Sequence, residues 1–186
     1  MKKLFTLCLF IIIGICLQAQ TFSWDITFLR GRTQESISIS QIITMQTGEE
    51  FSIRITPASD CFAYVVAYDS DRQIIVLHAG AVQGGDNIYQ RLRLTYPPGT
   101  ETLYVIMSLT RQTELERLIR IQRNHPTSQR HTSNLFREVS RLQNAASRLG
   151  EPSIEIIPIG GTDRGISLGT RFSDRNLYVR PITIHH

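Results

Sequence analysis

The sequence predicts an antiparallel β-sandwich with a two-helix insertion near its C-terminal third. Three observations lead to this fold class: residues 61–68 are apolar on both faces, several short segments alternate apolar and polar residues, and the apolar period lengthens between residues 113 and 150. Alternation with a period of two indicates strands, whereas a period of about 3.6 indicates amphipathic helices. Antiparallel strands bury their apolar face when a second layer of structure covers it.

Residues 49–77 contain the segment around which the predicted sandwich is organised. Apolar and polar residues alternate over residues 51–56, which predicts a half-buried strand. In residues 61–68 large and small side chains alternate, with Phe62, Tyr64, Val66 and Tyr68 on one face and Cys61, Ala63, Val65 and Ala67 on the other. A strand that is apolar on both faces is expected in the middle of a packed structure. With the polar loop 69–73 and the β-branched segment 74–77, we expect an antiparallel meander of three strands.

Further strands are expected at residues 24–29, 36–40, 89–94, 102–109, 153–159 and 177–184. The segment 102–109 predicts a second buried strand, with Leu103, Val105, Met107 and Leu109 on one face and Tyr104 and Ile106 on the other. Pro158 favours an edge position for its strand, because proline has no backbone N–H to donate. The glycine-rich segments 78–87 and 160–165 are interpreted as loops.

Two amphipathic helices are expected between residues 113 and 150. Thr113 and Glu116 have the spacing of a capping box, in which the hydroxyl bonds the Glu116 amide and the carboxylate bonds back to the first residue. Pro126 ends the first helix, whose apolar stripe consists of Leu115, Leu118, Ile119 and Gln122. The second helix begins near Ser133 and ends at Gly150, and its stripe consists of Leu135, Val139, Leu142, Ala146 and Leu149. We expect a helical hairpin laid on the sheet or over one edge of the sandwich.

Residues 1–19 have the pattern of a secretory signal peptide. Lys2 and Lys3 precede an apolar run over residues 4–17, and the small Ala19 precedes the expected cleavage point. Cleavage leaves residues 20–186, which we interpret as one exported domain. A membrane anchor is an alternative, but the fourteen-residue run is shorter than the roughly 20 residues that span a bilayer. Lipidation of Cys16 is another, although Ile15 stands where a small residue is usual.

The composition after cleavage excludes some structural and functional classes. Cys61 is then the sole cysteine, so we expect an exported fold held together by packing rather than by disulfide bonds. The basic residues are eighteen arginines against sixteen acids, a net charge of +2 once Lys2 and Lys3 are removed. No nucleic-acid-binding motif occurs in the sequence, and we expect no nucleic-acid partner for an exported protein.

Four segments between residues 45 and 110 resemble a bacterial domain of unknown function, family 4384. They are Gly48-Glu49-Glu50-Phe51, Asp60-Cys61-Phe62-Ala63-Tyr64-Val65, the turn and strand over residues 69–77, and Pro98-Gly99-Thr100-Glu101 with the strand that follows. Arg72 stands where the family usually has glycine, and His78-Ala79 replaces its usual Pro-Asn. The resemblance implies a β-sandwich domain of bacterial envelope proteins, and it implies no catalytic residues.

A row of arginines on the second predicted helix is the main candidate for a binding surface. At about 100° per residue, Arg137, Arg141 and Arg148 project opposite the apolar stripe, and Arg130 joins them if the helix extends backward. Residues 111–148 hold eight arginines and three acids, whereas the rest of the exported chain holds ten arginines and thirteen acids. This segregation favours docking of an anionic protein, cell-wall or lipid partner, although charged helix faces are also commonly just solvated.

Other residue combinations point to chemistry only weakly. Cys61 and His78 are a nucleophile and a base by residue type, which makes a hydrolase the alternative function, but nothing in the sequence supplies an oxyanion hole. Asp69 and Asp71 are interpreted as turn residues, because the segment lacks the glycine and glutamate of a calcium loop. The five histidines lack metal-site spacing, and no glycine-rich segment has the pattern of a phosphate loop, so no cofactor or metal is expected.

The functional expectation is therefore a non-catalytic, exported module of the bacterial cell envelope, in the periplasm or outside the cell. Its expected partner is an envelope protein or a cell-wall component. The alternatives are a hydrolase that uses Cys61 and His78, and a binder of anionic membrane surfaces through Arg137, Arg141 and Arg148.

Overall fold

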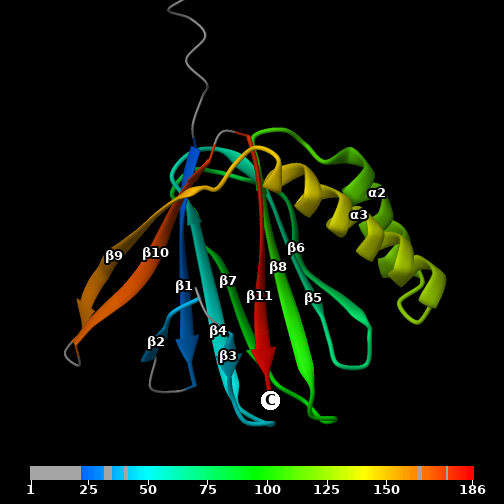
Figure 1. Ribbon diagram of the computed structural model, residues 1–186, viewed down its shortest axis with the longest axis horizontal. Helices are drawn as coiled ribbons and strands as arrows, with labels where there is room; N and C mark the ends of the chain where they lie inside the picture. Colours follow the sequence, from blue (N-terminus) through cyan, green and yellow to red (C-terminus); the bar gives the residue numbers. More distant parts are fainter. Residues whose placement is uncertain (1–21, 32–34, 40–41, 163–164, 175) are drawn as a thin grey trace, which may run out of the picture.

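The computed structural model describes residues 22–31, 35–39, 42–162, 165–174 and 176–186, and it confirms a mainly β fold with a helical insertion. The expected signal peptide, residues 1–19, and Cys16 lie outside the described residues. Figure 1 shows three layers, in which two β-sheets face each other and two helices cover the outer side of one sheet.

The first sheet has six strands in the order β7-β4-β1-β10-β9, with β2 paired to β1. Its members are β1 (Phe22–Arg30), β2 (Glu35–Ile37), β4 (Glu50–Pro57), β7 (Ile88–Arg93), β9 (Ser153–Thr162) and β10 (Gly165–Asp174). Strand β9 lies at the edge, as Pro158 predicted.

The second sheet has five strands in the order β3-β11-β8-β5-β6. Its members are β3 (Ile43–Thr44), β5 (Cys61–Tyr68), β6 (Ile74–Val82), β8 (Thr100–Ser108) and β11 (Leu177–His185). Strand β5 pairs antiparallel with both β6 and β8, which leaves β6 at the free edge. Tyr64 and Val65 are both 0% exposed, so the prediction of a central strand buried on both faces is confirmed.

The two faces of β5 and β8 belong to different apolar clusters, as the alternation predicted. One cluster lies between the sheets and takes the small residues of β5 together with Leu103, Val105 and Met107. The other lies between the five-stranded sheet and the helices, and it contains Tyr64, Val66 and Ile106.

The expected meander of β4, β5 and β6 is wrong. Strand β4 pairs with β1 and β7 in the six-stranded sheet, whereas β5 and β6 belong to the other sheet. The short segment between β4 and β5 crosses from one sheet to the other instead of closing a hairpin. Its backbone is held there because the Ala58 N–H donates to the Ser23 carbonyl oxygen and the Gly85 N–H donates to the Pro57 carbonyl oxygen.

Two segments interpreted as loops contain strands. Strand β6 continues to Val82, and a bulge opposite Val65 and Val66 accommodates the extra residue. Strands β9 and β10 pair with each other as far as Thr162 and Gly165, and residues 165–174 form a strand that was not predicted. The hairpin turn between β5 and β6 is confirmed, with Arg72 at a φ of 61°, where glycine would be less strained.

Helices α2 (Thr113–Asn124) and α3 (Gln129–Ser147) form the expected hairpin on the outer face of the five-stranded sheet (Figure 1). The buried stripe of α2 is the predicted one. In α3 four of the five predicted stripe residues are buried, but Leu149 is 48% exposed because the helix ends at Ser147. The helix also begins earlier than Ser133, at Gln129.

Candidate functional site

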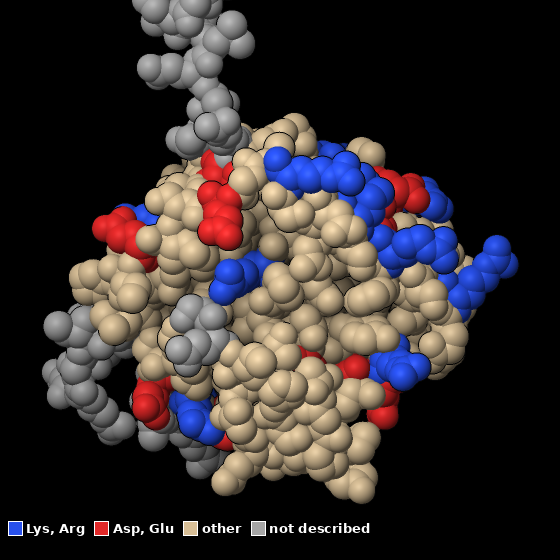
Figure 2. Space-filling model, viewed as in Figure 1, with Lys and Arg blue, Asp and Glu red and all other residues tan. Residues whose placement is uncertain are grey.

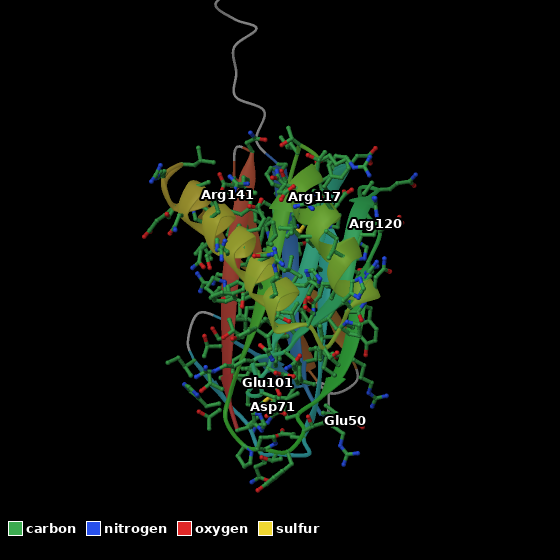
Figure 3. All side chains as sticks on the ribbon, turned by 90° about the vertical axis from the view of Figure 1, so that its right-hand side faces the viewer. Glu50, Asp71, Glu101, Arg117, Arg120 and Arg141 are labelled. Carbon is green, nitrogen blue, oxygen red and sulfur yellow. The ribbon has the colours of Figure 1, made fainter. Side chains whose placement is uncertain are left out.

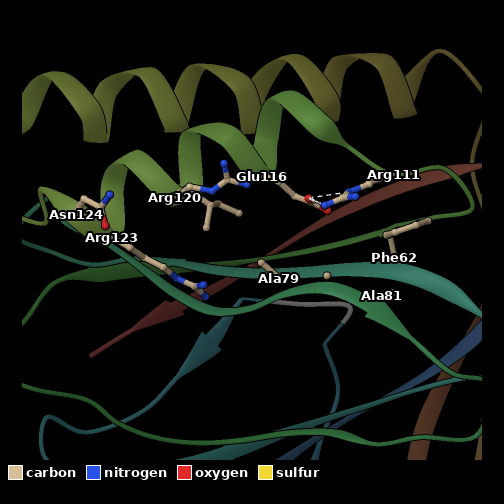
Figure 4. A pocket seen from close by; sticks show the side chains of 10 residues that line it. Phe62, Ala79, Ala81, Arg111, Glu116, Arg120, Arg123 and Asn124 are labelled. Carbon is tan, nitrogen blue, oxygen red and sulfur yellow. Dashed lines mark hydrogen bonds and ion pairs between the residues drawn. The ribbon is translucent and has the colours of Figure 1, made fainter.

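A groove with a volume of about 450 Å³ lies between helix α2 and edge strand β6. Ala79, Gly80 and Ala81 of β6 form one side, and α2 forms the other (Figure 4). Phe62 and Ile119 add apolar surface, and the remaining lining residues are Arg111, Glu116, Arg120, Arg123 and Asn124. The volume lies in the range of roughly 300–1,000 Å³ that is usual for ligand sites.

Small side chains account for the hollow. Elsewhere under the helices, large side chains such as Tyr64, Tyr104 and Phe136 fill the space between the layers. Along β6 the residues that face α2 are Ala79 and Ala81, which leave the gap beneath the helix open. A groove with an apolar floor and a basic rim can hold an anion that also has apolar or backbone surface.

A buried tyrosine fixes the N-terminal end of α2 over the sheet. The Tyr64 hydroxyl accepts a hydrogen bond from the Gln112 N–H and donates one to the Glu116 carboxylate, each at 3.0 Å. Arg111 donates to the same carboxylate from its Nε at 2.8 Å. The hydrogen bond from Arg111 lowers the pKa of Glu116, whereas burial raises the pKa of Tyr64 to about 12. Glu116 is therefore an ionised carboxylate that accepts from both neighbours.

The predicted capping box of Thr113 and Glu116 is wrong, because Glu116 bonds other residues. Helix α2 begins at Thr113 after the cap residue Gln112, whose own side chain makes no capping hydrogen bond. The Glu116 carboxylate contacts Tyr64 and Arg111 rather than the first residue of the helix. A contact with the sheet has thus replaced the local contact that the spacing predicted.

The acids of the helical hairpin neutralise only some of its arginines. Glu116 pairs with Arg111, Glu114 with Arg117 and Glu138 with Arg141. The other five arginines are exposed and form no ion pair with another described side chain, namely Arg120, Arg123, Arg130, Arg137 and Arg148. We call these five the unpaired arginines.

The figures show where this charge lies. In Figure 2 basic side chains gather over the helices at the upper right of the molecule. In Figure 3 the labelled arginines Arg117, Arg120 and Arg141 lie on the helical end, whereas Glu50, Asp71 and Glu101 lie at the opposite end. The helical end is therefore rich in arginine, whereas the opposite end carries both acids and arginines, with Glu50 paired to Arg91 and Glu49 paired to Arg30.

The structure divides the predicted arginine row on α3. Arg130, Arg137 and Arg148 are exposed and belong to the unpaired arginines. Arg141 is also exposed, but its guanidinium binds both oxygens of Glu138 at 2.7 and 2.6 Å. Arg120 and Arg123 of α2, which the sequence analysis did not single out, line the groove. Their spacing of three residues was visible in the sequence, but the alanines opposite them lie far away along the chain.

Cys61 and His78 are not brought together. Cys61 is opposite Val82 in the β5–β6 ladder, whereas His78 is opposite Val65, about four residues or 13 Å further along the strand. Cys61 is 4% exposed in the cluster between the sheets, and burial raises its pKa to about 11. This thiol is buried and protonated, so the pair lacks the geometry and the thiolate of a nucleophilic site.

The remaining candidates have structural roles. The Asp69 carboxylate accepts a hydrogen bond from the Gln73 N–H at 2.7 Å, as expected for a turn. The imidazole of His185 contacts the Thr100 hydroxyl, and that of His186 contacts Thr47 and Glu101. The His186 side chain is buried. Within the described ranges no group of three or more histidine, cysteine or acidic residues is arranged to hold a metal ion.

No protein-family model, curated protein or solved structure matches this chain. The resemblance to family 4384 over residues 45–110 stays a hypothesis drawn from its motifs. Neither described helix is long and apolar enough to cross a membrane.

Proposed function

We propose that this protein is a non-catalytic, exported module of the bacterial cell envelope that binds an anionic protein or cell-wall partner through the basic surface of its helical hairpin. The observation that carries the proposal is the set of five unpaired arginines on α2 and α3. Exposed guanidinium groups without a partner in the fold are available to bind carboxylates or phosphates of another molecule.

Two further features support the proposal. The signal-peptide pattern of residues 1–19 predicts export. Residues 111–148 hold eight arginines and three acids, so the surface of the helical hairpin carries an excess of positive charge that attracts anions (Figure 2). The resemblance to family 4384 is consistent with an envelope location.

The proposal is tested by recovering partners from an envelope extract with the wild-type protein and with a variant in which all five unpaired arginines are serine. We expect the variant to lose the partners that the wild type retains at low salt. A control variant replaces five arginines outside the helical hairpin with serine, and it should retain these partners. The five are Arg54, Arg72, Arg91, Arg93 and Arg171. Equal recovery by both variants would contradict the proposal.

The wild type and the variant that lacks the five unpaired arginines also distinguish membrane binding from binding to a protein or cell-wall partner. Vesicles that contain anionic lipid are mixed with the wild type and sedimented at low salt. Binding that depends on the five unpaired arginines, together with unchanged recovery from a lipid-free extract, would favour the membrane surface over a protein or wall partner.

A further inference from the structure

We infer that the groove between α2 and β6 binds an extended acidic peptide segment, which pairs with the free edge of β6 while its carboxylates contact Arg120 and Arg123. This inference rests on the proposed function, because it assigns the anionic partner to one part of the basic surface. It commits to a protein segment in strand conformation rather than to a lipid or a free anion.

The edge of β6 is open to such pairing. Strand β6 is the last strand of its sheet, and its ladder partner among the described residues is β5 alone. An edge strand presents alternate N–H and C=O groups to its open side, and an extended peptide can satisfy them by adding another strand. The residues of β6 that line the groove are small, at Ala79, Gly80 and Ala81, so a neighbouring chain meets no bulky or charged side chain over these three positions.

The rim of the groove selects for negative charge. Arg120 and Arg123 lie one helical turn apart on α2, and both line the groove without an acidic partner among the described side chains. The one acid in the lining, Glu116, is already bound by Arg111 and Tyr64. In Figure 4 the Arg123 side chain extends from α2 toward β6, and Asn124 lies beside it. The excess charge at the rim is therefore positive.

The spacing of side chains along a strand explains how one peptide could use both the free edge of β6 and the arginines at the rim. Alternate side chains of an added strand point to one face and lie about 6.6 Å apart along the chain. Those on the side of α2 would enter the groove, so acids at alternate positions would meet the arginines in succession. Apolar or small residues at the same positions could contact Phe62 and Ile119. A peptide with acidic residues at alternate positions would therefore fit both the free edge of β6 and the arginines at the rim of the groove.

The experiment uses the purified full chain and an end-capped peptide of about eight residues in which glutamate alternates with threonine or valine. Binding is measured by fluorescence anisotropy at low salt. We expect Arg120→Ser with Arg123→Ser to weaken binding by about tenfold or more. Arg137→Ser with Arg148→Ser, which removes the same charge from α3, should change it by less than about twofold. Equal losses in the two double variants would overturn the assignment to the groove.

Strand pairing is tested with two N-methylated forms of the same peptide. One carries N-methyl groups at odd positions and the other at even positions, so only one form keeps the N–H groups that face β6. We expect one form to bind like the parent and the other to lose binding. Equal binding by both forms would overturn strand addition. Equal binding by a peptide with lysine in place of glutamate would overturn the preference for acidic side chains.

These outcomes separate the inference from the proposed function. If the variant that lacks all five unpaired arginines loses its envelope partners while both N-methylated forms bind alike, the inference fails and the proposed function stands. If the peptide binds as expected while that variant retains every envelope partner, the proposed function fails and the peptide site stands.

Discussion

The two faces of strand β5 build two different kinds of layer. On the inner face Cys61, Ala63 and Val65 are small, and the space between the sheets is filled by large aromatic side chains such as Trp24 and Phe172. On the outer face the relation is reversed, because β5 supplies the large side chains and the helices supply leucines and isoleucines. One strand thus contributes to an inner layer of aromatic rings and an outer layer that docks a helical hairpin.

The layers also differ in how much hydrogen bonding they contain. The outer layer includes the Tyr64–Glu116–Arg111 contacts and a buried bond from the Gln122 amide to the Thr132 hydroxyl at 3.1 Å. Apolar burial is non-directional, whereas hydrogen bonds fix one arrangement of the groups that they join. The inner layer therefore chiefly stabilises the fold, whereas the hydrogen bonds of the outer layer orient α2 above β6 and so shape the groove.

The largest effect on the free energy of unfolding is expected from a substitution that leaves a cavity in the inner layer. Trp24 is fully buried, with its ring 4.6 Å from Tyr178 and 4.7 Å from Phe22 between ring centroids. Trp24→Ala should lower the free energy of unfolding by about 3–5 kcal/mol, because it removes a large apolar side chain and leaves a cavity. Urea unfolding followed by circular dichroism measures the loss. A change below about 1 kcal/mol would show that the inner layer is not the main source of stability.

A smaller effect is expected from the tyrosine that joins α2 to the sheet. Tyr64→Phe keeps the ring but removes the hydroxyl that bonds Gln112 and Glu116. We expect a loss of about 1–2 kcal/mol, because the Gln112 N–H is left without its acceptor near the buried layer. The control is Tyr68→Phe, at a partly buried ring that packs on Phe136. If the two variants lose the same stability, the Tyr64 hydroxyl does not orient the helix.

The local periodicity of the sequence predicted which face of each element is buried, but it did not predict which strands pair with each other. The faces of β5 and β8 and the stripe of α2 follow from residues within one segment, and all three are confirmed. The meander failed because a short turn after β4 is compatible both with a hairpin and with a crossing between sheets. Residues 166–172 do alternate, but no element was predicted between the expected loop 160–165 and the expected strand 177–184.

The groove could not be predicted from the sequence either, because it is formed by residues that are far apart along the chain. Arg120 and Arg123 belong to a basic stretch that was visible, but a hollow requires small residues opposite them. Those residues, Ala79 and Ala81, were assigned to a loop about 40 positions earlier in the chain. The capping box failed likewise, because Tyr64 is distant in sequence from Glu116 yet contacts it in the fold.

The arginines of α3 test whether pairing within the helix matters for stability. Arg141→Ser removes the guanidinium that binds the Glu138 carboxylate, whose side chain is only 9% exposed. We expect a loss of about 0.5–1 kcal/mol, since Arg141 itself is largely exposed and screened by solvent. Arg137→Ser should stay within about 0.5 kcal/mol of the wild type. An equal loss in both variants, measured by urea unfolding, would show that the Glu138 contact adds nothing.

The smallest effect is expected from His78, a partly buried residue of β6 opposite Val65. Burial, together with the charge of Arg123, lowers the pKa of His78 below its usual value of 6.5. The unfolded chain therefore binds a proton more readily than the folded chain over the pH range just below 6.5. Since protonation favours the state that binds the proton more tightly, the folded state should lose stability as the pH falls through this range and keep it above.

His78→Gln should remove this part of the pH dependence. The free energy of unfolding is measured in urea at several pH values on both sides of 6.5, for the wild type and for the variant. We expect the difference between the two proteins to change below 6.5, with the variant losing less stability on acidification, and to stay constant above it. Arg123→Ser should give part of the same effect, because it removes the nearby positive charge. Parallel curves for all three proteins would mean that the surroundings of His78 do not disfavour its charged form.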